Sequence, residues 1–591
     1  MMTRRTIFGL VWWGMGFLLV ACGGNSPQYQ WLKAPGWSRA LAVGSTQVGD
    51  PAPVAVDEQG NSYLFLISGE TESRPRLLAY APQMTQRWEV ILPLSLTLPD
   101  KPNLYWRNDG LDVFWLSERT LFYARLNGDG DILVEPAAIS PEDVPIDAYS
   151  VAYDEDQVAH IWFSGPRRSP GLYAMTLKGE TPAAALVDAN GIAPVIIMDA
   201  NHTLHAVWAY YPSGAGTLTL LYASYPNGNY VSDQEIVVVE TNVSSTSILR
   251  GPELGLDDEL VYLFWTIEIR TGPQAGVIDS RYVTFLPSDV TTISPSIPLK
   301  APIVTELAYQ EWAETDIMAG ARVAHLEQNY PMSGSMNGIV TNKAIGSELP
   351  IAFHNANVRY ESRQTNGQVA LLFMEKGQPT SYQLLSYSTG SPHVPFLISN
   401  RAGELYLTWL EAASPSGFTV FLTSTAPEMV DALGQLSGND VVKLGGTTIF
   451  GMLSGMVLSP LVVSIWLIAP MIIVGLAFFF QGGFREDELT TGGLISISLG
   501  VVTYWVVKLV SLPNLFVYVP FSAWIPIIPP WLEFILRYGL PVFITLVGII
   551  TAWWFTIRRH VASPLYFMLI FGLVDGVLTL AVHGIYFFNL L

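Results

Sequence analysis

The sequence predicts two structural classes in one chain, a mainly β N-terminal region and a C-terminal bundle of transmembrane α-helices. Between about residues 45 and 425, short apolar strands, tight turns and aromatic residues recur, as they do in repeated β units. After residue 446 four long apolar stretches follow. Each is near or above the ~20 residues that a helix needs to cross a bilayer.

The charge is divided unevenly between these regions. The 591 residues carry a formal net charge of −20, and from Leu444 onward five basic residues balance five acidic ones. The excess negative charge therefore belongs entirely to residues 1–443. A field of this sign repels nucleic acid and anionic lipid headgroups and favours cations or basic partners. We therefore expect no nucleic-acid partner.

The N-terminus has the pattern of an export signal. Two arginines, Arg4 and Arg5, precede an apolar run from Ile7 to Val20 and the sequence Ala21-Cys22. A basic start followed by a short apolar run predicts a secretory signal peptide. The alternative is a signal anchor with an incidental cysteine, but the run is short for crossing a bilayer. Both interpretations place the following residues outside the cytoplasm.

Cys22 is the one cysteine of the chain, so intrachain disulfides and multi-cysteine metal or haem sites are excluded. The sequence Leu19-Val20-Ala21-Cys22 resembles the lipobox of bacterial lipoproteins. This resemblance implies that residues 1–21 are a lipoprotein signal peptide and that Cys22 carries a covalent diacylglycerol. Residues 22–44 would then be the lipidated N-terminus and its tether.

The middle of the chain repeats one pattern of strands and turns. In one unit an apolar strand from Pro194 leads to a turn at Asp199, a second strand ending at Trp208 and a third containing Tyr222. Alternating short strands at this period predict a six- to seven-bladed β-propeller over residues 45–427, whose regular aromatic residues pack between blades. The other units start near Pro53, Pro102, Ser150, Pro252, Val358 and Pro395.

These units resemble the neuraminidase-repeat-like, sialidase-type propellers of bacterial surface proteins, whose blades read apolar strand, Asp-x-x-Gly, strand, Trp. The Ser-x-Asp-x-Gly-x-x-Trp box of true sialidases is absent, because Trp208 and Trp265 lack that spacing from an upstream aspartate. The arginine triad and Tyr/Glu pair of those enzymes cannot be assigned. The resemblance therefore implies architecture and not activity. An insertion at about 287–357 interrupts the repeats, either as a functional loop or as a poorly ordered excursion.

The C-terminal part is expected to consist of a linker or interfacial segment at 428–446 and a transmembrane domain at 447–591. The spans are expected near 447–480, 494–512, 534–557 and 564–588, and the first contains Pro460 and Pro470. With the propeller outside, four spans place Arg558 and Arg559 in the cytoplasm, as the positive-inside rule favours. The predicted location is the bacterial cytoplasmic membrane, with a lipid-anchored, multi-pass chain and its ectodomain on the outer face.

Four polar residues in the apolar spans are candidates for intramembrane function. Asp575 lies near the middle of the fourth span, and His583 lies two helical turns later on about the same face. Lys508 and Arg537 are possible partners nearer the outer side. Ionisable residues at this depth mark ion or proton paths, or pair structurally across a helix interface. We favour structural pairing, because four spans without a second central carboxylate make a poor transporter.

One polar loop has the spacing of a calcium site. Asn127, Asp129, Asp131 and Glu135 place oxygen ligands at positions 1, 3, 5 and 9, which resembles the calcium loops of integrin-type propellers. Ile132 stands where those loops have glycine, and Asn127 replaces the first aspartate. A polar hairpin turn is the favoured alternative. Apart from possible calcium and the lipid on Cys22, no cofactor is expected.

The sequence contains no Gly-x-Ser-x-Gly elbow, His-Glu-x-x-His helix or phosphate-binding Gly-Lys-Ser/Thr loop. We therefore identify no catalytic residues. The leading expectation is a membrane-anchored extracytoplasmic binding or scaffold protein, an accessory subunit of a larger membrane-protein complex, with the bilayer and a membrane protein as partners. One alternative is a surface propeller that binds or acts on glycans. Another is ion or proton transport, or signal transduction, through Asp575.

Overall fold

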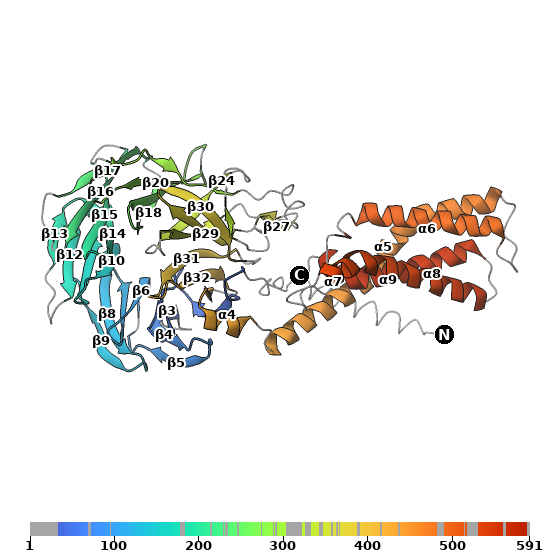
Figure 1. Cartoon of the computed structure of the whole chain (residues 1–591), viewed down its shortest axis with the longest axis horizontal. Helices are drawn as coiled ribbons and strands as arrows, with labels where there is room; N and C mark the ends of the chain where they lie inside the picture. The colour runs from blue at the N-terminus through green and yellow to red at the C-terminus, as the bar shows by residue number, and fades with distance from the viewer. Residues whose placement is uncertain are drawn as a thin grey trace. The chain divides into compact units, whose positions relative to one another are not determined.

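The computed structural model divides into a β unit that ends at residue 434 and a helical unit that begins at residue 438 (Figure 1). Each is described by itself. Cys22 and the signal peptide predicted at 1–21 lie outside the described residues. The structure describes residues 34–587 except for 69–72, 95, 98, 178–183, 213–215, 229, 231–233, 245–246, 274, 288, 290–291, 303–321, 325–331, 342–346, 356–358, 362–363, 366, 387–390, 414–416, 435–437, 481–489, 513–514, 517–529 and 559–562.

The β unit is a seven-bladed propeller, which confirms the predicted fold (Figure 1). Six blades have four strands and the sixth has five. In blade order the strands are β2 (Val54–Val56), β3 (Ser62–Ser68), β4 (Arg74–Tyr80), β5 (Gln86–Ile91); β6 (Pro99–Arg107), β7 (Gly110–Ser117), β8 (Thr120–Asn127), β9 (Ile132–Ala138); β10 (Ala148–Tyr153), β11 (Ala159–Ser164), β12 (Leu172–Leu177), β13 (Ala185–Asp188); β14 (Gly191–Met198), β15 (Thr203–Tyr210), β16 (Thr217–Pro226), β17 (Ile236–Asn242); β18 (Ser247–Leu256), β19 (Val261–Ile269), β20 (Ile278–Phe285), β21 (Ile297–Pro298); β25 (Met336–Thr341), β26 (Leu349–Asn355), β29 (Gln368–Glu375), β30 (Gln378–Leu384), β23 (Val323–Ala324); and β31 (His393–Ser399), β32 (Leu405–Ala412), β33 (Phe418–Ser424), β1 (Leu41–Thr46).

The N-terminal strand closes the ring by completing the seventh blade. β1 pairs antiparallel with β33, so that Leu41 lies opposite Leu422. Just before β1, the Ser38 amide donates a hydrogen bond to the Ser424 carbonyl at 2.7 Å. The Trp37 indole donates one to the Gln383 side chain of blade six at 3.1 Å. The first and last strands are therefore joined although nearly 380 residues separate them.

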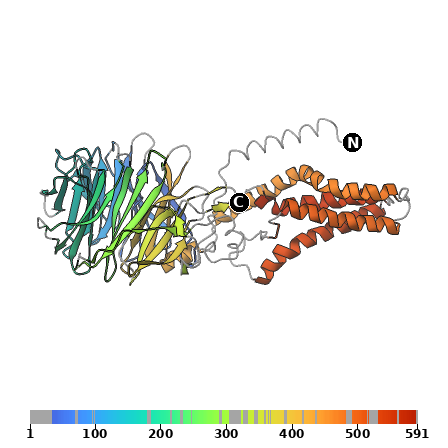
Figure 2. The same cartoon turned by 90° about the horizontal axis from the view of Figure 1, so that it is seen from above.

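The chain enters and leaves the propeller at the same face. In Figure 2 the strands of the blades run between the two faces of the propeller. We call the face that carries the turns between the first and second strands of the blades the turn face, and the opposite one the bulge face. β33 runs toward the turn face, and the short helix α4 (Pro427–Leu433) follows it. Met429 of α4 is 2% exposed and packs into the core between blades seven and one. The hydrogen bond between Ser38 and Ser424 places the incoming chain beside it.

A bulge recurs in the inner strand of five blades. In each, two residues interrupt the register with the second strand, and the first of them has a positive φ. In four blades the second is proline, which has no N–H to give to the ladder. The prolines that mark the sequence repeat at four of its seven unit starts therefore mark these bulges. The residues with positive φ are Lys101, Ala193, Gly251, Gly338 and Val394.

The Asp residues of the repeat lock the turn between the first two strands. The Asp57 carboxylate accepts hydrogen bonds from the Gln59 amide, from the Asn61 amide and side chain, and from the Tyr63 hydroxyl, at 2.7–2.9 Å. Asp257 accepts a bond from Tyr262 in the equivalent place at 2.5 Å. In blades three and four histidine replaces this tyrosine: His160 bonds Asp154 at 3.0 Å and His205 bonds Asp199 at 3.2 Å. These side chains therefore hold turns and the strands that follow them.

The repeated aromatic residues form the core between blades, as expected. Trp115, Trp162, Trp208, Trp265 and Trp409 are all at most 2% exposed. Each stands on the second strand of its blade and packs into an apolar cluster shared with a neighbouring blade. Because one blade cannot bury both of its faces, this stacking supplies the core.

The sixth blade begins earlier than the unit that the sequence places near Val358. Its inner strand is β25 and its second strand is β26, and both fall within the predicted insertion at 287–357, as does β21 of blade five. Gly367 lies in the connection between the second strand, β26, and the third strand, β29 (Gln368–Glu375). That connection contains a short hairpin, β27 (Arg359–Glu361) with β28 (Gln364–Thr365), which imitates the start of a unit. A further pair, β22 (Ala301–Pro302) with β24 (Met332–Gly334), lies in the same range.

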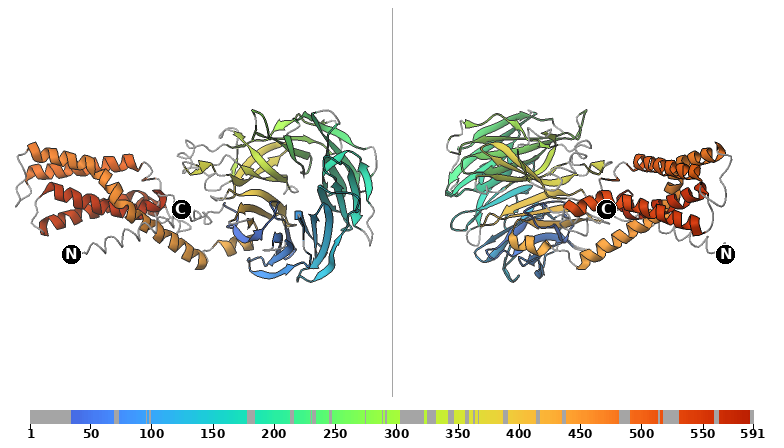
Figure 3. Two further views of the ribbon diagram at one scale, coloured as in Figure 1. Left: turned by 180° about the vertical axis from the view of Figure 1, so that it is seen from behind. Right: turned by 45° about the vertical axis from the view of Figure 1, so that its right-hand side comes forward.

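The helical unit contains four helices that are long and apolar enough to cross a membrane, as predicted (Figure 3). The candidate spans are Thr448–Ala477, Thr491–Ser511, Ile535–Thr556 and Pro564–His583. α9 packs against α5, α6 and α8 and is the central helix. The helices are α5 (Gly438–Phe480), α6 (Thr491–Ser511), α7 (Pro530–Phe534), the π-helical turn η3 (Ile535–Gly539), α8 (Leu540–Arg558) and α9 (Pro564–Phe587).

α5 continues through Pro460 and Pro470 as one helix. Pro460 has no N–H for the carbonyl of Met456, four residues earlier. The Ser459 hydroxyl donates a hydrogen bond to that carbonyl at 2.7 Å. A backbone group left unsatisfied in hydrocarbon costs several kcal/mol, so this serine makes the proline tolerable inside a span.

Candidate functional sites

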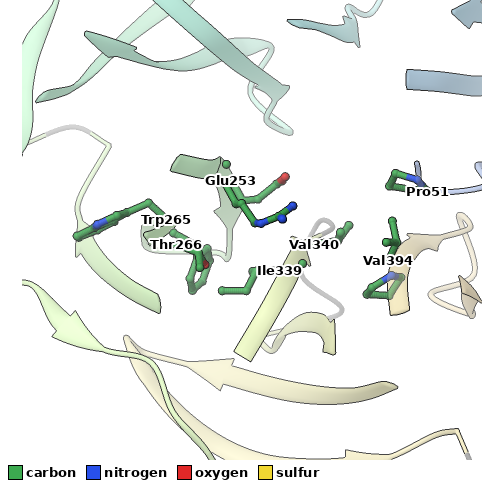
Figure 4. Close-up of a pocket in the computed structure, with 12 residues that line it drawn as sticks. Pro51, Glu253, Trp265, Thr266, Ile339, Val340 and Val394 are labelled. Atoms are coloured by element: carbon green, nitrogen blue, oxygen red, sulfur yellow. The ribbon is translucent and has the colours of Figure 1, made fainter. Parts of the chain in front are cut away.

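The bulges of neighbouring blades line a cavity in the propeller (Figure 4). Its volume is about 160 Å³. Blade five contributes Arg250, Gly251 and Glu253 from its bulge, while blades six and seven contribute their bulges at Gly338 and Val394. Pro51, just before blade one, lines another side. The cavity therefore lies toward the bulge face, and segments separated by hundreds of residues build it.

Glu253 is the one acidic residue among the described residues that line this cavity. Its side chain extends from its strand toward Pro51 and Val340 (Figure 4). No hydrogen bond or ion pair joins it to another of the described residues. Desolvation in the cavity raises the pKa of the Glu253 carboxyl to about 8. At pH 7 the group is therefore mostly protonated, and it can both donate and accept a hydrogen bond.

The second ionisable group that lines the cavity already has a partner. The Arg250 guanidinium bonds the Glu268 carboxylate at 2.9 Å, and Arg270 bonds the other oxygen of the same carboxylate at 2.9 Å. Glu268 thus holds Arg250 and Arg270 together, while Glu253 has no ion pair with another of the described residues.

A carboxyl pair lies at the edge of this region. Asp50, next to Pro51, receives a hydrogen bond from the Lys101 amide at 3.3 Å. Burial, together with a hydrogen bond and repulsion from Asp100, raises the pKa of the Asp50 carboxyl to about 7. Asp50 therefore adds an acid group of raised proton affinity next to Pro51.

A second cavity lies at the turn face between blades seven and one. Its volume is about 200 Å³, and its walls include Glu58, Asn400, Glu404 and Glu428. The Asn400 side chain donates to Glu404 at 2.7 Å, and Arg401 forms an ion pair with Glu58 across the blade boundary. These contacts hold the blade junction next to α4.

The intramembrane candidates divide into a paired group and two other residues. Lys508 on α6 and Asp575 on α9 are fully buried, and Lys508 Nζ lies 2.7 Å from Asp575 Oδ2. Lys508 also donates to the Thr579 hydroxyl at 2.7 Å, and the Thr545 hydroxyl of α8 donates to Asp575 Oδ1 at 2.6 Å. Three helices therefore meet in one hydrogen-bonded ion pair.

The other two candidates, His583 and Arg537, have different surroundings. His583 is buried on α9, and its Nδ1 lies 3.3 Å from the Thr579 carbonyl. Arg537 lies in the π-helical turn η3, half-buried. The Thr503 hydroxyl of α6 donates a hydrogen bond to the Leu499 carbonyl of its own helix at 2.8 Å.

The predicted calcium loop is a tight turn between β8 and β9. The Asn127 side chain accepts hydrogen bonds from the amides of Asp129 and Asp131 and donates one to the Asp131 carboxylate at 2.9 Å. Glu135 is exposed on β9. Within the ranges that the structure describes, no group of three or more His, Cys, Asp or Glu side chains is placed to hold a metal ion.

Four residues of these sites were not predicted from sequence: Glu253, Asp50, Thr545 and Thr579. A signal for Glu253 existed: at the corresponding place after the bulge, the other four blades have Asn103, Val195, Val340 and Phe396, none of them charged. No such signal marked Thr545 or Thr579, because threonine is common in spans and needs no partner outside its own helix.

The sequence matches no protein-family model. It also matches no curated protein. Among solved structures it is similar to an ulvan lyase bound to -[GlcA(1-4)Rha3S]-, with a TM-score of 0.43, 8% identity, and coverage of 65% of this chain and 95% of the other. A second polysaccharide lyase gives a TM-score of 0.40 with 8% identity and coverage of 65% and 90%.

A neuraminidase-like protein of A/little yellow-shouldered bat/Guatemala gives a TM-score of 0.32, with 11% identity and coverage of 56% of this chain and 95% of the other. At identities of 8 to 11%, the activity of none of these proteins transfers to this chain.

Proposed function

We propose that this chain is a membrane-anchored extracytoplasmic binding protein and an accessory subunit of a larger membrane-protein complex. In this proposal Cys22 carries a diacylglycerol anchor and the propeller lies outside the bacterial cytoplasmic membrane. The observation that carries the proposal is the position of the propeller's two ends. Both leave at the turn face of blade seven, whereas the Glu253 cavity lies toward the bulge face.

The helical unit supports a role as anchor rather than as conductor of ions. Asp575, the residue on which a transport or signalling function would depend, is bonded to Lys508 and Thr545 within the bundle. A fully paired charge of this kind holds helices together. The propeller's negative charge favours a partner with a basic surface.

The full-length protein, purified from gently solubilised native membranes, tests the proposal through its mass in native mass spectrometry. We expect a complex of defined stoichiometry that contains at least one additional membrane protein. Protease added to intact spheroplasts should remove the propeller and spare the helical unit. Recovery of this polypeptide alone from crosslinked and uncrosslinked membranes would contradict the subunit role, and a protected propeller would contradict the orientation.

A glycan-binding propeller is the second candidate. It is favoured by the Glu253 cavity, where a carboxyl and a guanidinium stand between apolar walls, because such groups hydrogen-bond sugar hydroxyls. A glycan array with the full-length protein in nanodiscs tests this candidate. Binding that is lost in Glu253→Gln would support it, and the absence of any bound glycan would exclude it.

A further inference from the structure

The Glu253 cavity contains an acid that pairs with no cation among the described residues. Of the described groups that line it, only Arg250 and Glu253 are ionisable. Arg250 is bonded at 2.9 Å to Glu268, a carboxylate that it shares with Arg270. β19, β25, β31 and the segment before β2 contribute apolar or uncharged residues. The neighbouring acid, Asp50, interacts with Asp100 and the Lys101 amide. Glu253 is therefore the group in this cavity whose charge is left unmatched.

The bulge of blade five explains why a glutamate points here. The residues at 251 and 252 interrupt the pairing between β18 and β19, and pairing resumes with Glu253 opposite Phe264. The bulge turns the strand, and bulges commonly re-aim a side chain next to a functional site. An acid that served only packing would be costly here, since burying an unpaired polar group destabilises the fold.

The size and field of the cavity limit what can compensate Glu253. Cavities of roughly 150 Å³ accommodate a ligand of the size of benzene, and this cavity measures about 160 Å³. Its lining includes the apolar residues Ile339, Val340 and Val394, together with Arg250, which Glu268 holds. The net charge of −20 lies in the residues before 444, so the surrounding field concentrates cations. A short aliphatic chain that ends in a cationic group matches these three properties.

We propose that the Glu253 cavity binds one ammonium or guanidinium group on a short aliphatic chain, with the Glu253 carboxylate as its counter-ion. The inference rests on the proposed binding function and names the chemistry that the site recognises. The cation could come from a free amine or from a lysine or arginine side chain of a partner. Binding forms an ion pair in a desolvated space, where it is stronger than at the surface.

Binding has a consequence that separates it from adventitious cation attraction. The free Glu253 carboxyl has a pKa of about 8, so it is about nine-tenths protonated at pH 7. A cationic ligand requires the carboxylate, so its binding releases this proton to the buffer. Calorimetry in two buffers of different ionisation enthalpy measures that release directly.

The experiment uses the full-length protein in nanodiscs with four probes at pH 7. n-Butylammonium and N-acetyl-lysine amide carry the cation, as a free amine and as a side chain respectively. n-Butanol and N-acetyl-norleucine amide are their neutral counterparts. We expect at least tenfold tighter binding of one or both cations than of their neutral counterparts, with close to one proton released per ligand bound. The cation that binds more tightly identifies the source.

Three variants complete the test. Glu253→Gln should lose the preference for cations and the proton release. Glu253→Asp, which keeps a carboxyl, should retain both with weaker binding. Asp156→Asn, which removes an exposed acid in the turn of blade three, should bind like the natural protein. Equal binding of the neutral probes, or unchanged proton release in Glu253→Gln, would overturn the proposal.

The co-purification experiment separates this inference from the proposed function. A complex that persists in Glu253→Gln while the cation preference is absent in the natural protein would refute the cation site alone. If no complex is found but the cation probes bind as expected, the accessory-subunit role fails and the site stands.

Discussion

The ion pair between Lys508 and Asp575 predicts a non-additive response to substitution. Both side chains are 0% exposed and lie 2.7 Å apart. Removing one partner leaves a buried charge whose remaining bonds come from threonine hydroxyls, Thr579 for Lys508 and mainly Thr545 for Asp575. In protein interiors such a loss costs about 3–5 kcal/mol. We expect Asp575→Asn and Lys508→Met each to lower the free energy of unfolding of the bundle by about this amount.

The double variant Lys508→Met/Asp575→Leu should recover most of the loss. Replacing a buried pair by apolar residues of similar size is often neutral or stabilising by about 1–4 kcal/mol, since neither charge then has to be desolvated. Both changes also make their helices more apolar, so membrane insertion is not impaired. Thr545→Val, which removes one bond to the carboxylate, should cost about 1.5–3 kcal/mol.

Unfolding by increasing mole fractions of SDS in mixed micelles, followed by circular dichroism at 222 nm, measures these differences. Thr503→Val is the matched control, because that hydroxyl bonds its own helix and its side chain is exposed. It should change the unfolding free energy by no more than about 0.5 kcal/mol. If the single variants resemble this control, or if the double variant is less stable than either single one, the pair does not hold the bundle as argued.

Three further changes test the propeller and the helix packing. Asp57→Ala removes four hydrogen bonds of 2.7–2.9 Å from the turn of blade one. It should lower the free energy of unfolding of the propeller by about 2–4 kcal/mol, as thermal melts followed by tryptophan fluorescence will measure. The control Asp156→Ala, at an exposed position in the turn of blade three, should leave the melting curve unchanged. Gly576→Ala would place a Cβ 2.1 Å from Val463 Cγ2, whereas a Cβ at Gly475 meets nothing within 4 Å. Gly576→Ala should therefore destabilise the bundle by about 1–3 kcal/mol, and Gly475→Ala should not. SDS titration of both variants measures the difference. Glu253→Gln should alter the pH dependence of propeller stability, because a carboxyl whose pKa is raised from 4.5 to about 8 makes the folded state lose stability as pH rises through that interval. The variant should therefore melt at a higher temperature than the natural protein at pH 9 and at the same temperature at pH 4. A constant difference in melting temperature across this range would contradict the burial of Glu253.

The repeat could be recognised from sequence because its signals are local. An Asp that caps its own turn and a Trp on the next strand lie within about ten residues of each other, so each blade carries its pattern in one short segment. The four spans could be predicted equally well, since hydropathy over some 20 residues decides whether a helix can lie in lipid. The blade that was misplaced, blade six, is the one whose β26–β29 connection contains the hairpin β27–β28, a local imitation of a blade start.

The Glu253 site was harder to predict from sequence, because its signals are not local. Glu253 is one polar residue in a strand, and its significance depends on Pro51, Val340 and Val394, which other blades bring to the same cavity. Lys508 and Asp575 could be picked out because a charge in an apolar span is costly wherever it stands. Lys508 and Arg537 were both possible partners of Asp575, and the sequence could not decide between them, since the choice depends on the angular position of the helices about their axes.

What the sequence determined by itself, then, is the division into a repeated β region and four apolar spans, together with the few charges that those spans contain. Each of these follows from interactions within a short segment or from the transfer of that segment into lipid. Tertiary structure alone decided that β1 completes the last blade, that α9 lies at the centre of the bundle and that the bulges of three blades line the Glu253 cavity. Those contacts join residues up to several hundred positions apart, and their free energy appears only when the ring closes and the helices pack.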